Sequence, residues 1–180
     1  MKHYSVLLNE CIEMLNIKEN GIYVDGTLGR GGHSEQILKR LKNGQLYVFD
    51  LDEVAIKEAK ERLKDFENIT YIHDNFANMH KYFEDETIDG IILDLGVSSP
   101  QFDDETRGFS YRFDSKLDMR MNLSQKKTAY DVVNYYAKED LGHIIKTYGE
   151  EAFAYKIADN ICKARQEKPI ETTFELVEII

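Results

Sequence analysis

The sequence predicts an α/β fold: a mostly parallel, doubly wound sheet with helices on both faces, followed by a helical region. Short runs rich in β-branched and aromatic residues alternate with helical patterns between residues 21 and 94, as they do in parallel β-α-β units. A cluster of glycines follows the first of these runs. From residue 128 to residue 180 the chain shows helical patterns without a strand.

The elements of the sheet follow one another in order. Strands are expected at 22–24, 46–49, 69–72 and 91–93, with helices at 34–41 and 54–63 after the first two. The run at 91–93 is apolar at consecutive positions, which is typical of a strand buried on both faces and would make a poor exposed edge. Four strands are few for a doubly wound sheet, so we expect the last strands to be absent from this chain.

The C-terminal part is expected to hold three or four helices. Thr172-Thr173-Phe174-Glu175 fits a capping box at the start of the last one. The chain then ends at Ile179-Ile180, inside an apolar helical stretch and without a C-cap signal. This ending also leads us to expect a chain truncated at its C-terminus.

The composition of the chain excludes several classes of function. A net charge of −10 argues against a protein that coats nucleic acid through bulk positive charge. No stretch approaches the ~18 apolar residues of a membrane helix, and the run Val6-Leu7-Leu8 is too short for a signal peptide. Cys11 and Cys162 lie far apart, outside any Cys/His cluster, which predicts reduced thiols in a cytoplasmic protein and no bound metal.

The glycine-rich stretch YVDGTLGRGGHS, residues 23–34, predicts a ligand site. No Lys-Ser or Lys-Thr follows its glycines, as a P-loop requires, and the dinucleotide pattern GxGxxG starting at Gly29 fails at Ser34. An acid at the end of the first strand followed by Gly29 and Gly31 fits S-adenosylmethionine (SAM) enzymes better. Asp25 is expected near the methionyl ammonium, while the two glycines let the backbone pass beneath the cofactor.

Further cofactor contacts are expected after the second and third strands. Asp50 ends the second strand, where an acid can accept hydrogen bonds from both ribose hydroxyls. Asp52 competes for this role, but it lies past the strand end and can open the next helix. Phe76, after the third strand, either packs on the adenine or is a core residue.

The loop after the fourth strand, Asp94-Leu95-Gly96-Val97-Ser98-Ser99-Pro100-Gln101, is expected to carry reacting groups because it follows the carboxyl end of a central strand. Ser99-Pro100-Gln101-Phe102 is a loose variant of a tetrapeptide that orients the exocyclic amine in amino-methyltransferases. We assign the catalytic role, as acceptors for an amine, to Asp94, Ser98, Ser99 and Pro100.

These motifs are similar to those of the 16S rRNA (cytosine-N4)-methyltransferases, and the similarity runs from residue 3 to residue 180. The stretches that carry it include His3-x-x-Val6-Leu7-Leu8, residues 23–34 and 89–101, Arg107-Gly108-Phe109-Ser110, Leu117-Asp118-Met119-Arg120-Met121 and Tyr148-Gly149-Glu150-Glu151.

The resemblance implies a Rossmann-like class I SAM methyltransferase sheet with an all-helical domain inserted after the fourth strand. The expected domains are a SAM-binding core at 1–105 and, at 106–180, a loop plus an incomplete substrate-recognition insertion. The implied substrate is a cytosine N4 amine of 16S rRNA in the decoding centre of the small ribosomal subunit. The implied SAM contacts are Gly31, Gly32, His33, Asp50, Phe76, Asp94 and Gln101.

A local basic segment is compatible with an RNA substrate. Residues 107–127 hold six basic side chains and two acidic ones, interleaved with aromatics, in the manner of surfaces that stack a base and hold its phosphates. The expected RNA-binding residues are Arg107, Phe109, Arg112, Lys116 and Arg120. The alternative interpretation is a solvated loop with aromatic residues beneath it.

One departure from the family pattern falls in this loop. Ser115-Lys116 stands where the family commonly has Gly-Pro, so we expect a more mobile loop in which Lys116 adds a phosphate contact. Three rival functions also stay open. They are a nicotinamide-dependent oxidoreductase, an inactive SAM-binding fragment, and an amino-methyltransferase with a different nucleic-acid target.

Overall fold

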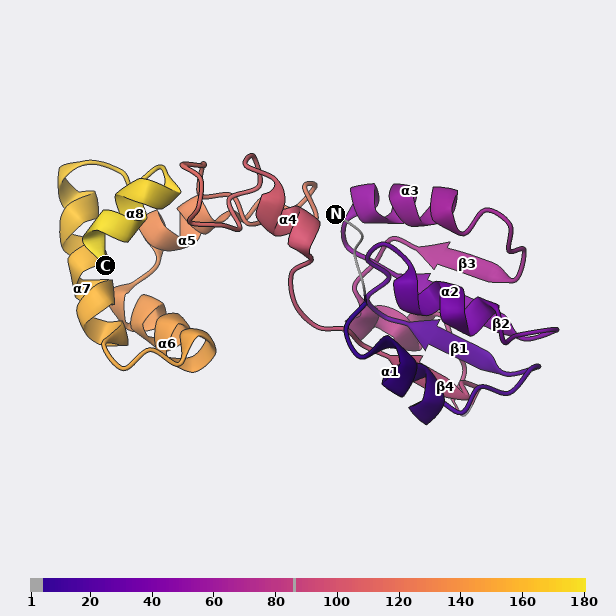
Figure 1. The fold of residues 1–180 in the computed structure, drawn as a ribbon. Helices are drawn as coiled ribbons and strands as arrows, with labels where there is room; N and C mark the ends of the chain where they lie inside the picture. Colours follow the sequence, from indigo (N-terminus) through magenta and orange to yellow (C-terminus); the bar gives the residue numbers. More distant parts are fainter. Residues whose placement is uncertain (1–4, 86) are drawn as a thin grey trace. The chain divides into compact units, whose positions relative to one another are not determined.

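The computed structural model describes residues 5–85 and 87–180 (Figure 1). His3, one of the residues that carry the family resemblance, lies outside the described residues. The chain divides into two compact units, of which unit 1 ends at Gly96 and unit 2 runs from Val97 to Ile180. The domain boundary expected at residues 105 and 106 stays a prediction.

Unit 1 is built on a four-stranded parallel sheet, as predicted. The strands are β1 (Ile22–Asp25), β2 (Gln45–Phe49), β3 (Ile69–Ile72) and β4 (Gly90–Ile92), in the order β3-β2-β1-β4. In the register, Val24 of β1 lies opposite Tyr47 of β2 and Ile91 of β4. The helices of this unit are α1 (Leu8–Met14), α2 (Gly32–Leu38), α3 (Glu53–Arg62) and the 3-10 helix η1 (Phe76–Lys81).

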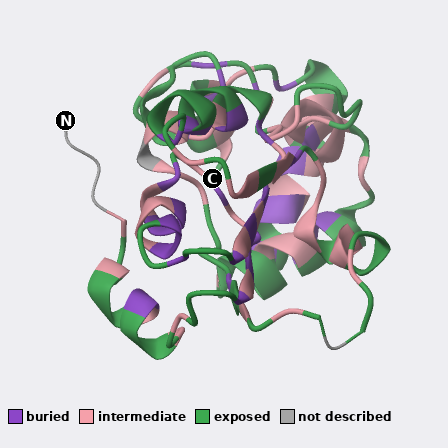
Figure 2. Ribbon diagram, turned by 90° about the vertical axis from the view of Figure 1, so that its right-hand side faces the viewer, coloured by how far each residue is buried: buried purple, intermediate pink, exposed green. Residues whose placement is uncertain are grey.

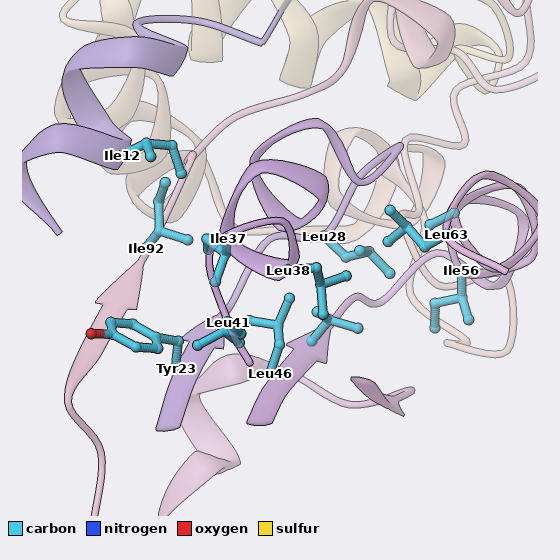
Figure 3. Packing of buried hydrophobic residues seen from close by; sticks show 12 residues of the cluster. Ile12, Tyr23, Leu28, Ile37, Leu38, Leu41, Leu46, Ile56, Leu63 and Ile92 are labelled. Carbon is cyan, nitrogen blue, oxygen red and sulfur yellow. The ribbon is translucent and has the colours of Figure 1, made fainter. Parts of the chain in front are cut away.

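Alternation along the strands sends side chains to two different cores. On one face, residues of α1, α2 and α3 pack against Tyr23, Leu46 and Ile92. Figure 3 shows Ile12 of α1 next to Ile92 of β4. On the other face, Val24 and other strand residues form a smaller cluster, against which Phe76, Met79, Phe83 and Ile88 pack. Each fully buried aliphatic side chain stabilises the fold by about 1.5–3 kcal/mol.

The fourth strand does not have the burial that its sequence predicted. Ile92 is buried, but Ile91 is 44% exposed and Leu93 is 43% exposed. Strand β4 lies at the edge of the sheet with β1 as its only strand neighbour among the described residues. The expectation of a strand buried on both faces is therefore wrong for this structure, because in the described part of the chain the face bearing Ile91 has little cover.

Unit 2 is helical, as expected. It contains α4 (Ser99–Asp103), α5 (Ala129–Tyr135), α6 (Lys138–Gly149), α7 (Ala154–Glu167) and α8 (Thr173–Ile179). Leu141 of α6 and Ile157 and Ile161 of α7 belong to its buried core. Figure 2 shows the buried residues of the chain in purple. The predicted capping box is confirmed, since Glu175 N–H donates to Thr172 Oγ1 at 3.3 Å.

Within the described residues, no helix is both long enough and apolar enough to cross a membrane.

Candidate functional site

The candidate site lies in unit 1, at the carboxyl ends of β1, β2 and β4. The order β3-β2-β1-β4 means that strand succession reverses between β1 and β4. Open α/β sheets bind ligands in the crevice outside the carboxyl strand ends at such a reversal. Two segments follow these strand ends, and we call them the glycine loop (residues 26–31) and the β4 loop (residues 93–96).

The glycine loop is held in a left-handed conformation at two positions. Gly29 has φ +49° and Gly31, the N-cap of α2, has φ +76°. A Cβ added at Gly31 would lie 2.9 Å from Leu63 Cδ1, whereas one at Gly29 would meet only the Thr27 carbonyl oxygen, at 3.8 Å. Gly31 therefore lets α3 pack closely against the loop. Gly29 leaves open space above the backbone, as a ligand cradle requires.

Asp50 fastens the glycine loop to the end of β2. Its Oδ2 accepts a 2.8 Å hydrogen bond from Gly29 N–H, and its Oδ1 accepts another at 2.8 Å from Asp52 N–H. Burial raises the pKa of Asp50. A carboxylate has about four lone-pair positions, so acceptor capacity remains for a ligand hydroxyl.

Asp52, which competed with Asp50 for the ribose-binding role in the sequence analysis, has a structural role. Its side chain accepts a 3.0 Å hydrogen bond from Val54 N–H and so caps the N-terminus of α3. The interpretation of Asp52 as a residue that opens the next helix is therefore confirmed.

Asp25 lies beneath the loop rather than at its surface. Its side chain is only 2% exposed, and its two oxygens accept hydrogen bonds from Thr27 N–H at 3.1 Å and from the Ser34 hydroxyl at 2.6 Å. Burial raises the pKa of Asp25, and the hydrogen bond from Ser34 opposes that shift. The structure thus gives Asp25 a role in shaping the loop, and its contact with the methionyl ammonium stays a prediction.

The glycine loop and the β4 loop are joined by Thr27. Asp94 N–H donates to Thr27 Oγ1 at 2.6 Å. The Asp94 side chain is exposed, and its carboxylate has no partner among the described residues. Sequence reasoning missed both Thr27 and Ser34. A threonine two positions after a strand-ending aspartate was the available signal, because aspartates often accept from the backbone N–H two residues on.

His33 and Phe76 lie close to this site in the fold. His33 is buried in the first turn of α2, and its Nε2 lies 3.1 Å from the Val6 carbonyl oxygen. Phe76 packs against the cluster of Val24, Phe49 and Ile72. These contacts support a core role for Phe76 without testing an adenine contact, so both cofactor roles stay predictions.

The turn at 98–101 belongs to unit 2. Ser98 is the N-cap of α4, Ser99 and Pro100 are its first residues, and Gln101 Oε1 accepts a 2.9 Å hydrogen bond from Ser98 N–H. The Gln101 amide oxygen therefore stabilises its own helix. The structure thus brings Asp25, Gly29, Asp50 and Asp94 to one end of the sheet in unit 1, while Ser98–Gln101 form a local motif of unit 2.

Two of the cations expected to bind RNA are engaged inside unit 2. Arg107 is only 8% exposed, and its guanidinium donates to the carbonyl oxygens of Arg120 and Met121 at 2.8 and 3.1 Å. Arg120 pairs with Asp118 at 2.7 Å, and its hydrogen bond holds the pKa of Asp118 below the usual range. In this structure the Arg107 guanidinium stabilises the loop from within, and its contact with RNA stays a prediction.

The other expected RNA-binding residues are more accessible. Arg112 is exposed and lies 3.2 Å from Asp103, and Lys116 is exposed. Phe109 is half-buried, with the Arg107 guanidinium 5.8 Å from its ring centroid. Tyr111, which lies between Phe109 and Arg112 in the sequence, is 78% exposed.

Ser115 ties the loop down instead of loosening it. Its hydroxyl donates to the Glu105 carbonyl oxygen at 2.5 Å, and its N–H donates to Thr173 Oγ1 at 3.0 Å. The Thr173 hydroxyl in turn donates to the Phe113 carbonyl oxygen at 2.7 Å. The expected loosening of the loop by Ser115 does not fit these contacts, since the serine supplies bonds that a glycine side chain lacks.

Unit 2 also contains an apolar cavity of about 610 Å³, lined in part by Val133, Leu141 and Ile157. Arg120 also lines it, but the expected cofactor residues do not. The described residues contain no group of three or more His, Cys, Asp or Glu side chains that could hold a metal ion.

A parallel sheet with a glycine loop after β1 and an acid after β2 is typical of cofactor-binding α/β domains. Residues 1–180 match the model of the MraW methylase family, and the chain belongs to that family. A relative from Clostridium botulinum (strain Kyoto / Type A2), named Ribosomal RNA small subunit methyltransferase H, is 58% identical over 183 residues, which cover 99% of this chain and 59% of the relative. A Finegoldia magna protein of the same name is 53% identical, with the same coverage. The chain thus spans 59% of the length of these relatives.

Solved structures show more distant likenesses. An rRNA methylase from Streptococcus thermophilus has a TM-score of 0.42 and 24% identity, covering 50% of this chain and 51% of that one. A SAM-dependent O-methyltransferase from Thermotoga maritima has a TM-score of 0.45 and 19% identity, covering 53% of this chain and 36% of that one. Neither likeness defines the function of this chain.

Proposed function

We propose that this chain is the cofactor-binding part of a SAM-dependent methyltransferase that modifies the N4 amine of a cytosine in 16S rRNA of the small ribosomal subunit. The observation that carries the proposal is the Asp50–Gly29 hydrogen bond, which places an acid beside an open glycine backbone at the strand reversal. Membership of the MraW methylase family supports it. We expect the protein to work in the cytoplasm, where ribosomal subunits are made.

The residues present fit SAM. The open space above Gly29 suits the close approach of an uncharged cofactor surface. Asp50 retains acceptor capacity for ribose hydroxyls. In this proposal the cofactor contacts are completed by Asp25, Gly31, Gly32, His33, Phe76, Asp94 and Gln101.

The chemistry requires positioning more than acid–base catalysis. When bound, SAM supplies an activated methyl group. A cytosine amine is a poor nucleophile because its lone pair is delocalised into the ring, so holding it in line supplies most of the rate gain. The exposed Asp94 carboxylate can accept a hydrogen bond from the amine and orient its lone pair. Ser98, Ser99 and Pro100 are the further acceptors in this proposal, and the amine's proton leaves to water after transfer.

RNA contact is proposed for the exposed side of the 107–127 loop. Arg112 and Lys116 would pair with phosphates, and Tyr111 offers an exposed ring for a base that has left its stack. Arg107, Phe109 and Arg120 would support this surface from within. The ion pair of Arg112 with Asp103 is solvent-exposed, so a phosphate can replace it at little cost.

The test is methyl transfer from labelled SAM to small ribosomal subunits that lack the modification, followed by nuclease digestion and mass spectrometry. Labelled N4-methylcytidine supports the proposal, and another labelled nucleoside contradicts the assigned target. SAM binding without transfer would identify an inactive SAM-binding fragment, and binding of NAD(H) without SAM would favour an oxidoreductase. Asp94→Ala is expected to slow transfer strongly, and near-normal turnover with intact SAM affinity would exclude its proposed role.

A further inference from the structure

Three hydrogen bonds connect α2 to the β4 loop through Thr27. The Ser34 hydroxyl on α2 donates to Asp25 Oδ2 at 2.6 Å, and Thr27 N–H donates to Asp25 Oδ1 at 3.1 Å. Thr27 Oγ1 then accepts from Asp94 N–H at 2.6 Å. Thr27 therefore uses its backbone toward β1 and its side chain toward β4.

This connection crosses the point at which the backbone hydrogen bonds between β1 and β4 end. Strands β1 and β4 are hydrogen-bonded neighbours up to the pair Asp25 and Ile92. Among the described residues, the hydrogen bonds between the two strands end on this side with Gly26 N–H, which donates to the Ile92 carbonyl oxygen at 3.0 Å. Beyond it the chain leaving β1 forms the glycine loop that leads to α2, whereas the chain leaving β4 enters the β4 loop. Backbone pairing therefore stops one residue before Thr27, and a side chain takes over.

We propose that Thr27 is a positioning residue that sets the placement of Asp94 relative to the glycine loop. The inference rests on the proposed function, in which the glycine loop and Asp94 contact the cofactor and Asp94 also orients the amine. Thr27 touches neither reactant in this account. Its hydroxyl accepts a hydrogen bond from the Asp94 N–H and so fixes the Asp94 backbone. The Asp94 carboxylate is thereby held near the cofactor.

The hydrogen bond to Asp94 N–H requires only the hydroxyl oxygen of residue 27. Variants that keep or remove this oxygen therefore test the proposal. Thr27→Val keeps the branched shape and removes the acceptor, while Thr27→Ser keeps the acceptor. Thr70→Val is the matched control, because Thr70 Oγ1 also accepts a hydrogen bond in unit 1, from Gln45 Nε2 at 3.1 Å, on exposed β3 surface. Asp94 is exposed, so its released N–H can bond to water and the valine variant is expected to fold.

The first readout is amide hydrogen exchange, which reports the Thr27–Asp94 bond whether or not the chain binds SAM. In Thr27→Val the Asp94 amide is expected to exchange about 10-fold faster. The amides of Val24 and Val48 are expected to be unchanged, and Thr27→Ser and Thr70→Val are expected to match the wild type at Asp94. Unchanged exchange at Asp94 in Thr27→Val would overturn the inference.

The second readout is the dissociation constant for SAM, measured by calorimetry on the same proteins. Thr27→Val is expected to raise it about 3- to 10-fold, the equivalent of one lost hydrogen bond, and Thr27→Ser is expected to restore it. Faster exchange at Asp94 with unaltered SAM affinity and methyl transfer would also reject a positioning role. Failure of the wild type to bind SAM contradicts the proposed function and with it the positioning role, whereas the exchange result separately decides whether Thr27 holds Asp94.

Discussion

Asp50 and Gly29 are joined by a 2.8 Å hydrogen bond from the Gly29 N–H to the Asp50 carboxylate. This bond links the end of β2 to the glycine loop after β1. One carboxylate therefore shapes the loop, and in the proposed function its remaining lone pairs accept hydrogen bonds from a ribose. Asp52, two residues on, is occupied by the N-terminus of α3.

Alanine substitutions of Asp50 and Asp52 should have different effects on SAM binding. Asp50→Ala is expected to raise the SAM dissociation constant by about 10- to 100-fold, because hydrogen bonds to a charged acceptor contribute about 1.5–3 kcal/mol. Asp52→Ala removes a helix cap and is expected to lower the free energy of unfolding by about 1 kcal/mol with SAM affinity unchanged. Calorimetry and urea unfolding check both. Equal SAM affinity in Asp50→Ala and the wild type would contradict the assignment.

The two left-handed glycines should also differ. Gly29→Ala is expected to lower the free energy of unfolding by about 1–2 kcal/mol, the cost of a left-handed backbone with a Cβ. Gly31→Ala adds a close contact with Leu63 Cδ1 and should cost about 1–3 kcal/mol more. For the same loss of stability, Gly29→Ala should lower SAM affinity more than Gly31→Ala does. The new methyl group at residue 29 occupies the open space above the glycine-loop backbone. A Gly31→Ala protein as stable as the wild type would be inconsistent with the packing described for α3.

Burial of Asp25 makes stability depend on pH in a defined direction. Its pKa is raised above the ordinary value of 3.8, so the native state binds the proton more tightly than the unfolded chain does. The free energy of unfolding therefore decreases as pH rises above 3.8. Asp25→Asn lacks this titration. The stability of the wild type relative to Asp25→Asn, from urea unfolding, should fall as the pH rises above 3.8, and a rise in relative stability would contradict the burial effect.

Two arginines of the same loop should give opposite phenotypes. Arg112→Ala is expected to weaken binding of labelled 16S rRNA and to reduce the salt dependence by about one phosphate contact, with stability unchanged. Arg107→Ala removes buried hydrogen bonds to two carbonyl oxygens and is expected to lower the free energy of unfolding by about 1.5–3 kcal/mol. Anisotropy titrations at several salt concentrations and urea unfolding distinguish the two. An Arg112→Ala protein with unaltered salt dependence would remove Arg112 from the proposed RNA surface.

Patterns among residues close together in the sequence predicted most of the sheet and some residues of the candidate site. The strands appeared as short apolar runs, and Asp50 and Asp52 could be ranked because one ends a strand and the other precedes a helix. These features depend on neighbours in sequence. The capping box of Thr172 and Glu175 has the same origin.

What could not be predicted depends on neighbours that are distant in sequence. The burial of Ile91 depends on what covers β4, and the burial of Arg107 depends on carbonyl groups 13 and 14 residues away. The roles of Thr27 and Ser34 require knowing that β1 and β4 are adjacent and that α2 lies over Asp25. Charge counting alone could not separate cations that hold the loop together from those that face solvent.

Calorimetric titration of this chain with SAM and, separately, with NADH tests the central claim most directly. We expect saturable binding of SAM at one site, no binding of NADH, and loss of most SAM affinity in Asp50→Ala. Saturable NADH binding without SAM binding, or SAM binding that Asp50→Ala leaves intact, would contradict it.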